Sequence, residues 1–593
     1  MDPKYLTLVQ ILDDLCTEAP ESNQKYRPNS SNLEEINCAR SLALTHLFLK
    51  VKCGIDTFTE RENLTCDGKS DGGLDAYFID RSTRKILLLQ AKFRTTAEGF
   101  KDKEVSADEL VKMELDRILK GKHDNSNGTS YNGKVHSFQK ELQKIGDIAL
   151  YHYQVIILAN LKRYKDAQIK QLLGNFDYEI FDSSKIYDEL VFPFCSSTYY
   201  DPSQIQIEIN LSQKQQPNLA QTISVQGGNS EITVLFAPTK EVGRIMSKYR
   251  NALLKFNPRN YLSLTRNPVN KRIHESIIGL STNEFAILNN GITFIADEIA
   301  LTQRSGIENV GQLIITAPQI INGGQTASTL SEIYEKEYPG NTHVFDGKEV
   351  MLKIINLEGV GTRKPEIIEA VSNATNRQTR VTEADRRSNS LLFMKIQKAL
   401  FSDFGYFFER KEGEFFYGID CGVLTKRIVI DRADLVRSYM AFTGDPSKAR
   451  GQAESELFTE ETILTLFSGT PTIPEIFFAY RVYSTIKELE RLHKRGKFLP
   501  KRRLGNAFRY GKFAVVASIG VNQPKVNTDI DKIDRDVVSL TQKVLKNWAQ
   551  FEKFAIAGTA NKDYFGRGEK DFDNYYKGSS LNADIKSFWR GVI

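Results

Sequence analysis

An acid, an amide and a basic residue stand in an otherwise apolar stretch, GGLDAYFIDRSTRKILLLQAKF, at residues 72–93. They are Asp75, Gln90 and Lys92. Carboxylate and amide oxygens are ligands that suit Mg²⁺. A lysine beside such an ion can orient or help to deprotonate an attacking water, and can stabilise negative charge on a phosphate in the transition state. These residue types therefore indicate metal-dependent hydrolysis of a phosphate ester.

The spacing of the three residues predicts that they meet on one face of a β-hairpin. With a turn at residues 81–84, Asp80 stands opposite Lys85 and Asp75 opposite Gln90. Directly opposed residues of an antiparallel pair project to the same face, and the period of two adds Lys92 to that face. A slip of one residue would separate the three side chains. The alternative interpretation is an ion pair on an exposed sheet face.

Helical and strand patterns alternate around this hairpin. Residues 31–50 have a broad apolar face and follow a Ser or Asn cap, which predicts a helix. Residues 107–121 show apolar residues at helical spacing, and residues 153–160 form an apolar run typical of a central strand. Asp71, in KSDGG, is interpreted as a turn residue. The N-terminal part is therefore predicted to be an α/β domain that positions the hairpin.

The chain has 593 residues, which is too long for one hydrophobic core and predicts an α/β protein of several domains. Changes in pattern and composition predict four parts: an α/β domain at 1–195, a polar connector with some strands at 196–240, a second domain of alternating strands and helices at 241–440, and a mainly helical region at 441–593.

Composition excludes several classes of protein. The six cysteines form no C-x-x-C pair, which argues against a structural zinc site and favours reduced thiols in a cytoplasm. No apolar run is long enough to cross a membrane, and the N-terminus lacks a signal-peptide pattern, so we expect a cytoplasmic protein without a membrane partner. The net charge of +6 permits a nucleic-acid partner without requiring one.

A second candidate site lies in APQIINGGQTASTLSEIYEKEY, residues 317–338, which predicts a strand, a glycine turn and a helix that starts near Ala327. Two glycines expose consecutive amides, and a helix N-terminus attracts anions. The loop residues predicted to bind a phosphate, either of a nucleotide or of a nucleic-acid backbone, are Asn322, Gly323, Gly324, Gln325 and Thr326. The alternative is a tight turn.

Arginine and lysine clusters supply further candidate phosphate ligands. Arg377, Arg380 and Arg410 are predicted to close over a ligand of the glycine loop. The basic segment HKRGKFLPKRRLGNAFRYGK, residues 493–512, interleaves basic and aromatic residues, and its Lys501, Arg502 and Arg503 are predicted to contact a DNA backbone. The alternative for both groups is a solvated basic surface.

The hairpin motif resembles the PD-(D/E)XK nuclease superfamily, and "GGLDAYFID…LLLQAKF" is most similar to its Mrr-like branch, where Gln often replaces the second acid. The resemblance implies that Asp75 binds the metal, that Gln90 occupies the second ligand position and that Lys92 is catalytic. It also implies a further metal-binding Glu on the preceding helix, for which Glu35 is the candidate and Glu34 the alternative.

The segments NPVNKRI, NNGIT, QIINGGQT, NATNRQTRV and FFERKEG, within residues 245–430, resemble the AIPR family of abortive infection and phage resistance. Its members often carry an N-terminal Mrr-like nuclease. The resemblance implies a DNA endonuclease of prokaryotic antiviral defence that uses Mg²⁺ or Mn²⁺ and is gated by the AIPR region. Cutting of both strands would favour a homodimer, and a phage-derived trigger or a nucleotide could activate it. The alternatives are a nucleotide-binding or nucleotide-hydrolysing sensor and a DNA-binding regulator, each with a degenerate nuclease domain.

Overall fold

The computed structural model describes residues 2–81, 83–106, 113–161, 165–200, 203–212, 218–257, 268–279, 282–303, 306–375, 382–469, 471–498, 504–522, 524–566 and 570–591. These residues form two compact units. The first unit contains residues 1–376 and 412–425, and the second contains residues 377–411 and 426–593. The chain therefore leaves the first unit, returns to it briefly, and leaves it again.

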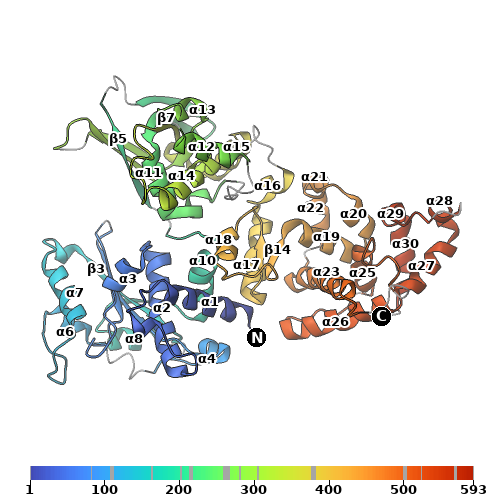
Figure 1. Cartoon of the computed structure of the whole chain (residues 1–593), viewed down its shortest axis with the longest axis horizontal. Coiled ribbons are helices and arrows are strands. Elements are labelled where there is room, and N and C mark those ends of the chain that lie inside the picture. Colours follow the sequence, from blue (N-terminus) through green and yellow to red (C-terminus); the bar gives the residue numbers. More distant parts are fainter. Residues whose placement is uncertain are drawn as a thin grey trace. The chain divides into compact units, whose positions relative to one another are not determined.

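A four-stranded sheet of order β1-β2-β3-β4 organises the N-terminal part of the first unit (Figure 1). Its strands are β1 (Ala76–Asp80), β2 (Lys85–Ala91), β3 (His152–Leu158) and β4 (Asp177–Ile180). β1 runs antiparallel to β2, whereas β3 is parallel to both β2 and β4. Asp80 stands opposite Lys85 and Ala76 opposite Leu89, so the predicted hairpin register is confirmed.

Helices cover both faces of this sheet. The helices of this part are α1 (Pro3–Thr17), α2 (Leu33–Cys53), α3 (Phe58–Asn63), α4 (Ala97–Asp102), α6 (Leu115–Leu119), α7 (Gly133–Gln143), α8 (Asp166–Leu172), α9 (Ser183–Ile186) and α10 (Phe192–Ser196). On one face the Phe138 ring of α7 packs against Tyr77 of β1, with ring centroids 4.2 Å apart. On the other side α2 approaches β2, where the Ser41 hydroxyl donates a hydrogen bond to the Ala91 carbonyl.

Two further sheets build the central part of the first unit. A three-stranded antiparallel sheet has the order β5-β10-β9, and a five-stranded mixed sheet has the order β11-β8-β12-β7-β6. Their strands are β5 (Gln204–Asn210), β6 (Asn218–Val225), β7 (Gly228–Pro238), β8 (Ile292–Ala296), β9 (Glu298–Gln303), β10 (Val310–Thr316), β11 (Gln319–Asn322) and β12 (Glu349–Asn356). The stretch 196–240, expected as a connector, thus supplies three strands to these sheets.

The central sheets pack against helices through one apolar core that includes residues of β8, β10, β12 and α14. The helices of this part are α11 (Thr239–Tyr249), α12 (Pro268–Ile278), α13 (Phe285–Leu288), α14 (Gly324–Lys336) and α15 (Lys364–Thr375). Helix α14 begins at Gly324, three residues before the expected start at Ala327, because Gly323 already occupies the cap position. The returning segment adds α18 (Phe416–Asp420).

The second unit is mainly helical, as the sequence predicts, with one large apolar core. A two-stranded parallel sheet pairs β13 (Phe407–Glu409) with β14 (Val429–Asp431). The helices are α16 (Glu383–Arg387), α17 (Leu391–Phe404), α19 (Arg432–Phe442), α20 (Pro446–Gly451), α21 (Glu454–Leu457), α22 (Glu460–Phe467), α23 (Ile473–Lys494), α25 (Lys512–Gly520), α26 (Ile530–Lys546), α27 (Trp548–Ala557), α28 (Lys562–Phe565), α29 (Phe572–Tyr575) and α30 (Ser580–Trp589). Within the described ranges, every helix is too short or too polar to cross a membrane.

Candidate metal centre

Three carboxylates meet at the start of β1. One oxygen from each of Asp67, Asp71 and Asp75 lies within 4.8 Å of an oxygen from the other two. Only Asp75 belongs to the hairpin motif. A set of closely spaced carboxylate oxygens is a donor set that suits Mg²⁺ or Mn²⁺. The cluster can therefore hold a divalent cation.

Backbone pairing brings Asp67 to the hairpin. The amides of Cys66 and Asp67 both donate hydrogen bonds to the Asp75 carbonyl, at 2.7 and 3.1 Å. The Tyr77 amide continues this pairing by donating to the Leu64 carbonyl at 3.0 Å. The segment 64–67 thus runs beside the first residues of β1 around an isolated antiparallel bridge of Thr65 with Ala76, and its last residue places a carboxylate beside Asp75.

A glycine turn positions Asp71. Its two carboxylate oxygens accept hydrogen bonds from the amides of Gly68 and Gly73, at 3.0 and 2.8 Å. Gly72 has a φ of +65°, and a Cβ there would lie 2.9 Å from both Ile118 Cδ1 and Tyr131 Cε1. A side chain at residue 72 is therefore excluded by conformation and by space. Asp71 is the turn residue that the sequence predicts, and the turn also brings its carboxylate to the cluster.

Asp75 is the most enclosed member of the cluster, with 9% of its surface exposed. Burial raises its pKa to about 8; the Asp67 carboxylate adds to the shift, while the Ala91 amide and the Lys92 ammonium oppose it. Desolvation and the Asp71 carboxylate also raise the pKa of Asp67. A divalent cation among these oxygens would relieve both the desolvation and the mutual repulsion. The electrostatics of the cluster therefore fit a bound cation.

Gln90 and Lys92 lie on either side of Ala91, whose amide donates a 2.6 Å hydrogen bond to Asp75 Oδ2. The Gln90 side chain is buried, and its Nε2 donates to the Gly73 carbonyl at 3.4 Å. The Lys92 ammonium acts on the charges of both Asp75 and Asp67. The structure thus brings all three residues of the hairpin motif to the neighbourhood of the carboxylate cluster.

Glu35 does not join this cluster, and neither does the alternative Glu34. The Glu35 carboxylate instead accepts hydrogen bonds from the Asn29 amide and from Asn32 Nδ2, both at 2.8 Å, at the start of α2. The physical reason is position: α2 packs on the face of the sheet that carries Ala91, and alternation along the strands places Asp75 and Gln90 on the opposite face. Glu35 lies in the first turn of α2, and its carboxylate is bonded to the N-cap residue Asn32 and to Asn29.

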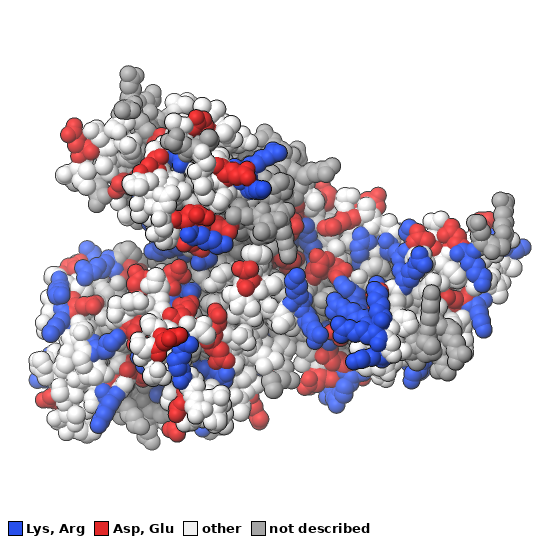
Figure 2. Space-filling model, in the orientation of Figure 1, with Lys and Arg blue, Asp and Glu red and all other residues white. Residues whose placement is uncertain are grey.

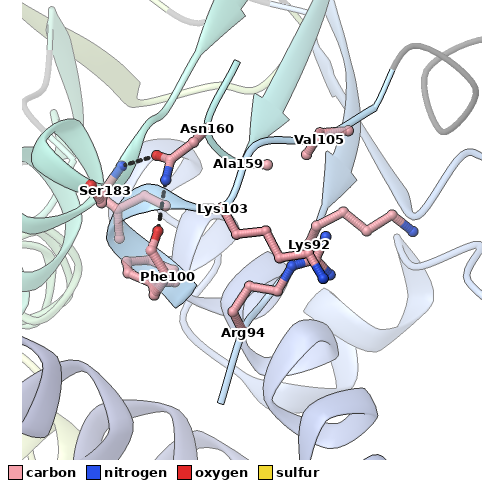
Figure 3. A pocket seen from close by; sticks show the side chains of 9 residues that line it. Lys92, Arg94, Phe100, Lys103, Val105, Ala159, Asn160 and Ser183 are labelled. Carbon is pink, nitrogen blue, oxygen red and sulfur yellow. Dashed lines mark hydrogen bonds between the residues drawn. The ribbon is translucent and has the colours of Figure 1, made fainter. Parts of the chain in front are cut away.

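A small pocket adjoins the catalytic candidate Lys92 (Figure 3). It is lined by Lys92, Arg94, Phe100, Lys103, Val105, Ala159, Asn160, Ser183 and Ile186. Its cationic side chains come from the chain that follows β2 and from the residue after α4. Figure 3 shows Asn160 and Ser183 hydrogen-bonded on one side of the pocket and Lys92 extending on the other. Lys92 therefore shares this pocket with two further cationic side chains, Arg94 and Lys103.

The glycine loop of the central part has partners within the protein. Gln325 Oε1 accepts a 2.9 Å hydrogen bond from Asn270 Nδ2, and the Thr326 hydroxyl accepts one from Asn289 Nδ2 at 3.2 Å. A Cβ on Gly323 would lie 2.7 Å from the Gly291 carbonyl oxygen. These contacts connect three segments of the chain, which are NPVNKRI through Asn270, NNGIT through Asn289, and INGGQT. The glycine and the amide that the sequence predicts to bind a ligand thus also pack closely against the protein itself.

The remaining members of the glycine loop also have neighbours within the protein. Asn322 ends β11, and a Cβ on Gly324 would lie 3.1 Å from both Asn257 Nδ2 and Leu254 Cδ2. Arg377 and Arg380, predicted to close over the loop, lie outside the described residues.

Arg410 belongs to the second unit, where its guanidinium donates to Gln397 Oε1 and to the Ser388 carbonyl, both at 2.7 Å. The structure assigns Arg410 these two contacts within the second unit.

Basic side chains gather on one face of the second unit, over the region of α23 and α26 (Figure 2). The last turn of α23 and the residues after it carry the exposed Arg491, Lys494, Arg495 and Lys497. Lys501, Arg502 and Arg503 lie outside the described residues. The Arg509 guanidinium lies over the Tyr510 ring, 4.9 Å from its centroid. This surface has the charge and the aromatic neighbours expected of a nucleic-acid contact.

The family model of the AIPR protein matches residues 254–558, slightly more than half of the chain. The chain therefore belongs to the AIPR family. The match continues well beyond residue 440, where the sequence pattern predicted the end of the central domain, and covers much of the helical second unit. Membership fits a role in abortive-infection defence against phage. No curated protein and no solved structure matches the chain.

Proposed function

We propose that this chain is a metal-dependent DNA endonuclease of prokaryotic antiphage defence, with its nuclease centre at the hairpin of β1 and β2 and its activity gated by the AIPR region. The observation that carries the proposal is the carboxylate cluster beside Lys92. Isolated acidic groups are common on protein surfaces, but a buried acid with a raised pKa, next to a lysine in a hairpin, is an arrangement that favours function over stability.

The arrangement of elements supports a PD-(D/E)XK fold. A helix, α2, precedes the bridge-forming segment 64–67, the antiparallel pair β1 and β2, and the parallel strand β3. Asp75 stands at the start of β1, and Gln90 and Lys92 stand at the end of β2. Ends of adjacent strands are where such enzymes collect metal ligands and a catalytic lysine, so the order of elements and the position of the motif agree.

The proposed reaction is hydrolysis of a phosphodiester. The oxygen of a water forms a bond to phosphorus, the bond to one ester oxygen breaks, and that oxygen takes up a proton. The bound cation would supply charge neutralisation and activation of the water. Asp67, Asp71 and Asp75 would hold it, and the Lys92 ammonium would stabilise the negative charge that develops on the phosphate oxygens. Gln90, bonded to the Gly73 carbonyl, would keep the turn and the strand end in place.

The test is cleavage of plasmid and phage DNA by the purified full-length protein with Mg²⁺, Mn²⁺ or EDTA. The parent should cut only with a divalent cation, and Asp75→Ala and Lys92→Ala should each reduce the rate at least about 100-fold, as expected for groups that act on the reacting phosphate. Asp116→Ala is the matched control, because Asp116 is an exposed acid on α6 that pairs with Lys120. Parent-like cutting by both site variants would show that the centre lies elsewhere.

A further inference from the structure

The five-stranded sheet of the central part ends in an exposed strand, β6. In the order β11-β8-β12-β7-β6 it is an outer strand, and among the described strands it pairs only with β7. Six of its eight residues, 219–224, are exposed. Alternate residues of an outer strand direct their amide and carbonyl groups away from the sheet, where another strand can pair with them. The outer edge of β6 can therefore accept a further strand.

β6 lacks the features by which proteins usually protect such an edge, which are charged side chains, prolines and bulges. Its sequence, NLAQTISV, contains no charged residue and no proline. Its register with β7 runs without a shift from the pair Asn218 and Leu235 to the pair Val225 and Gly228, so no bulge interrupts the strand. A long, regular edge without charged side chains is expected of a strand that pairs with another chain.

Three exposed apolar side chains lie on one face of this edge. Leu219 stands opposite Val234 of β7. Because side chains alternate with a period of two, Ile223 shares the face of Leu219, and Phe236 shares the face of Val234. The exposed fractions are 62% for Leu219, 40% for Ile223 and 39% for Phe236. Exposed apolar side chains that are grouped on one surface indicate an interaction site.

The sequence of β6 is complementary to itself across a two-fold axis. Leu219 and Ile223 lie at equal distances from Gln221 along the strand. When two β6 strands pair antiparallel with Gln221 of one copy opposite Gln221 of the other, each Leu219 stands opposite an Ile223. Every facing pair is then uncharged, and both apolar pairs form on the face that Leu219 and Ile223 share. A second copy of the chain supplies this pattern by symmetry, which favours it over an unrelated partner.

We propose that β6 is an interface between two copies of this chain, which pair their β6 strands antiparallel about a two-fold axis at Gln221. The five-stranded sheet of one copy then continues into that of the other, and the edge of each β6 is satisfied. The interface lies outside the carboxylate cluster, so the inference goes beyond the proposed function and does not depend on it. Together the two proposals place two nuclease centres in one assembly, which is the number needed to cut both strands of a duplex.

The test is the mass of the full-length protein in solution, measured by analytical ultracentrifugation over a series of protein concentrations. The parent should form a dimer. Leu219→Lys/Ile223→Lys should raise the dissociation constant of the dimer at least about tenfold, because like charges then stand opposite each other in both symmetric pairs. The control is Leu150→Lys/Leu464→Lys, which makes the same change in charge at two leucines outside β6 that are each 63% exposed. This control should dimerise like the parent.

A reversal of charge tests the register. Leu219→Lys/Ile223→Glu also introduces two charged residues, but antiparallel pairing about Gln221 places each new lysine opposite a glutamate of the other copy. This variant should recover the dimer that Leu219→Lys/Ile223→Lys loses. Circular dichroism of each variant checks that it is folded.

A cross-link tests the position of the axis. Gln221→Cys should form a disulfide between two copies when oxidised glutathione is added, because the pairing brings the two new cysteines face to face. The parent treated in the same way is the control for the exposed Cys38.

Three results would overturn the interface: a parent that stays monomeric at every concentration, a folded Leu219→Lys/Ile223→Lys protein that dimerises like the parent, and a control that dissociates to the same extent as this variant. A monomeric parent would leave the edge of β6 to a different partner. If the charge reversal does not recover the dimer and Gln221→Cys forms no cross-link beyond that of the parent, the pairing about Gln221 is wrong. None of these measurements uses DNA cutting, so failure of the nuclease proposal leaves their outcome unchanged.

Discussion

The Ala91 amide donates a 2.6 Å hydrogen bond to the Asp75 carboxylate, which joins the start of β1 to the residue between Gln90 and Lys92. One backbone group thus sets the distance between the acid and the two other members of the hairpin motif. The bond also favours the ionised carboxylate, in opposition to burial and to the Asp67 charge. The position of this acid is therefore determined by strand pairing, and its charge by what surrounds it.

Asp75 should make stability depend on pH in a defined window. Its pKa is raised from 3.8 to about 8 in the folded protein, so above about pH 4 the unfolded state releases this proton more readily than the folded state. Without metal, the free energy of unfolding should fall as pH rises from about 4 to about 8, by up to about 1.4 kcal/mol per pH unit. Urea unfolding in EDTA at about pH 6 and about pH 8.5 measures this.

Asp75→Asn should remove most of that pH dependence, because the amide carries no charge to desolvate. It should be more stable than the parent at about pH 8.5 and similar near pH 4. Asp116→Asn should follow the parent, since this exposed acid lies outside the cluster. If the parent and Asp75→Asn show the same pH dependence, the buried acid is not responsible for it.

Divalent cations should reverse the effect of high pH. At about pH 8, Mg²⁺ or Mn²⁺ should raise the melting temperature of the parent, because binding to the folded state alone adds stability. Asp75→Asn should abolish this increase, and Asp67→Asn should reduce it substantially. Differential scanning fluorimetry with a metal titration checks both. A parent melting temperature that does not respond to either metal would argue against a cation at this cluster.

Gln325→Ala should destabilise the central part of the first unit even when no ligand is present. The substitution removes the hydrogen-bond acceptor of the Asn270 side-chain amide. Asn270 is 0% exposed, and removal of a buried hydrogen-bond partner costs about 1–3 kcal/mol. Chemical unfolding provides the value. Titration of the parent with ATP, CTP and GTP tests whether the loop binds a nucleotide. Nucleotide binding that Gln325→Ala abolishes at unchanged stability would show that the loop is a ligand site.

The basic segment should contribute to DNA affinity without regard to sequence. Replacement of Lys501, Arg502 and Arg503 by Gln should weaken binding equally for unrelated duplexes and flatten the salt dependence by about one unit for each phosphate that is no longer neutralised. A variant with the same change in charge elsewhere in the second unit serves as the control, with Gln at Lys553, Lys562 and Lys570. Similar salt slopes for the two triple variants would show that the segment is a solvated basic surface without its own contact to DNA.

The hairpin and its register could be predicted because turn, alternation and apolar pattern all act locally. Asp67 could not be found in the same way, because it reaches Asp75 through backbone pairing of a segment with little strand pattern of its own. A signal was nevertheless present: Asp67, Asp71 and Asp75 recur every four residues around glycines that permit a tight turn. Spacing of acids through a glycine-rich turn is therefore as informative as spacing along a strand.

For two residues that the sequence predicts to bind a ligand, the structure shows partners within the protein, and such partners are not visible in the sequence. Glu35 was assigned to the metal from its place on the preceding helix, but its carboxylate accepts hydrogen bonds from the Asn29 amide and from Nδ2 of the N-cap residue Asn32. Gln325 was assigned to a ligand because a turn needs no amide, but Asn270, far away in the chain, is its partner. The local sequence indicates which polar residues could bind a ligand, and tertiary contacts determine their role.

The return of residues 412–425 to the first unit has a consequence for synthesis on the ribosome. In this segment the Phe415 ring packs against Phe192, and Tyr417 against Phe194, with centroids 5.7 and 5.8 Å apart. A chain is synthesised from its N-terminus. Phe192 and Phe194 therefore lack their ring partners until the strands of the central sheets and the first helices of the second unit have been made. An incomplete chain would leave these apolar rings uncovered in the first unit, so a prematurely ended product would tend to aggregate or be degraded.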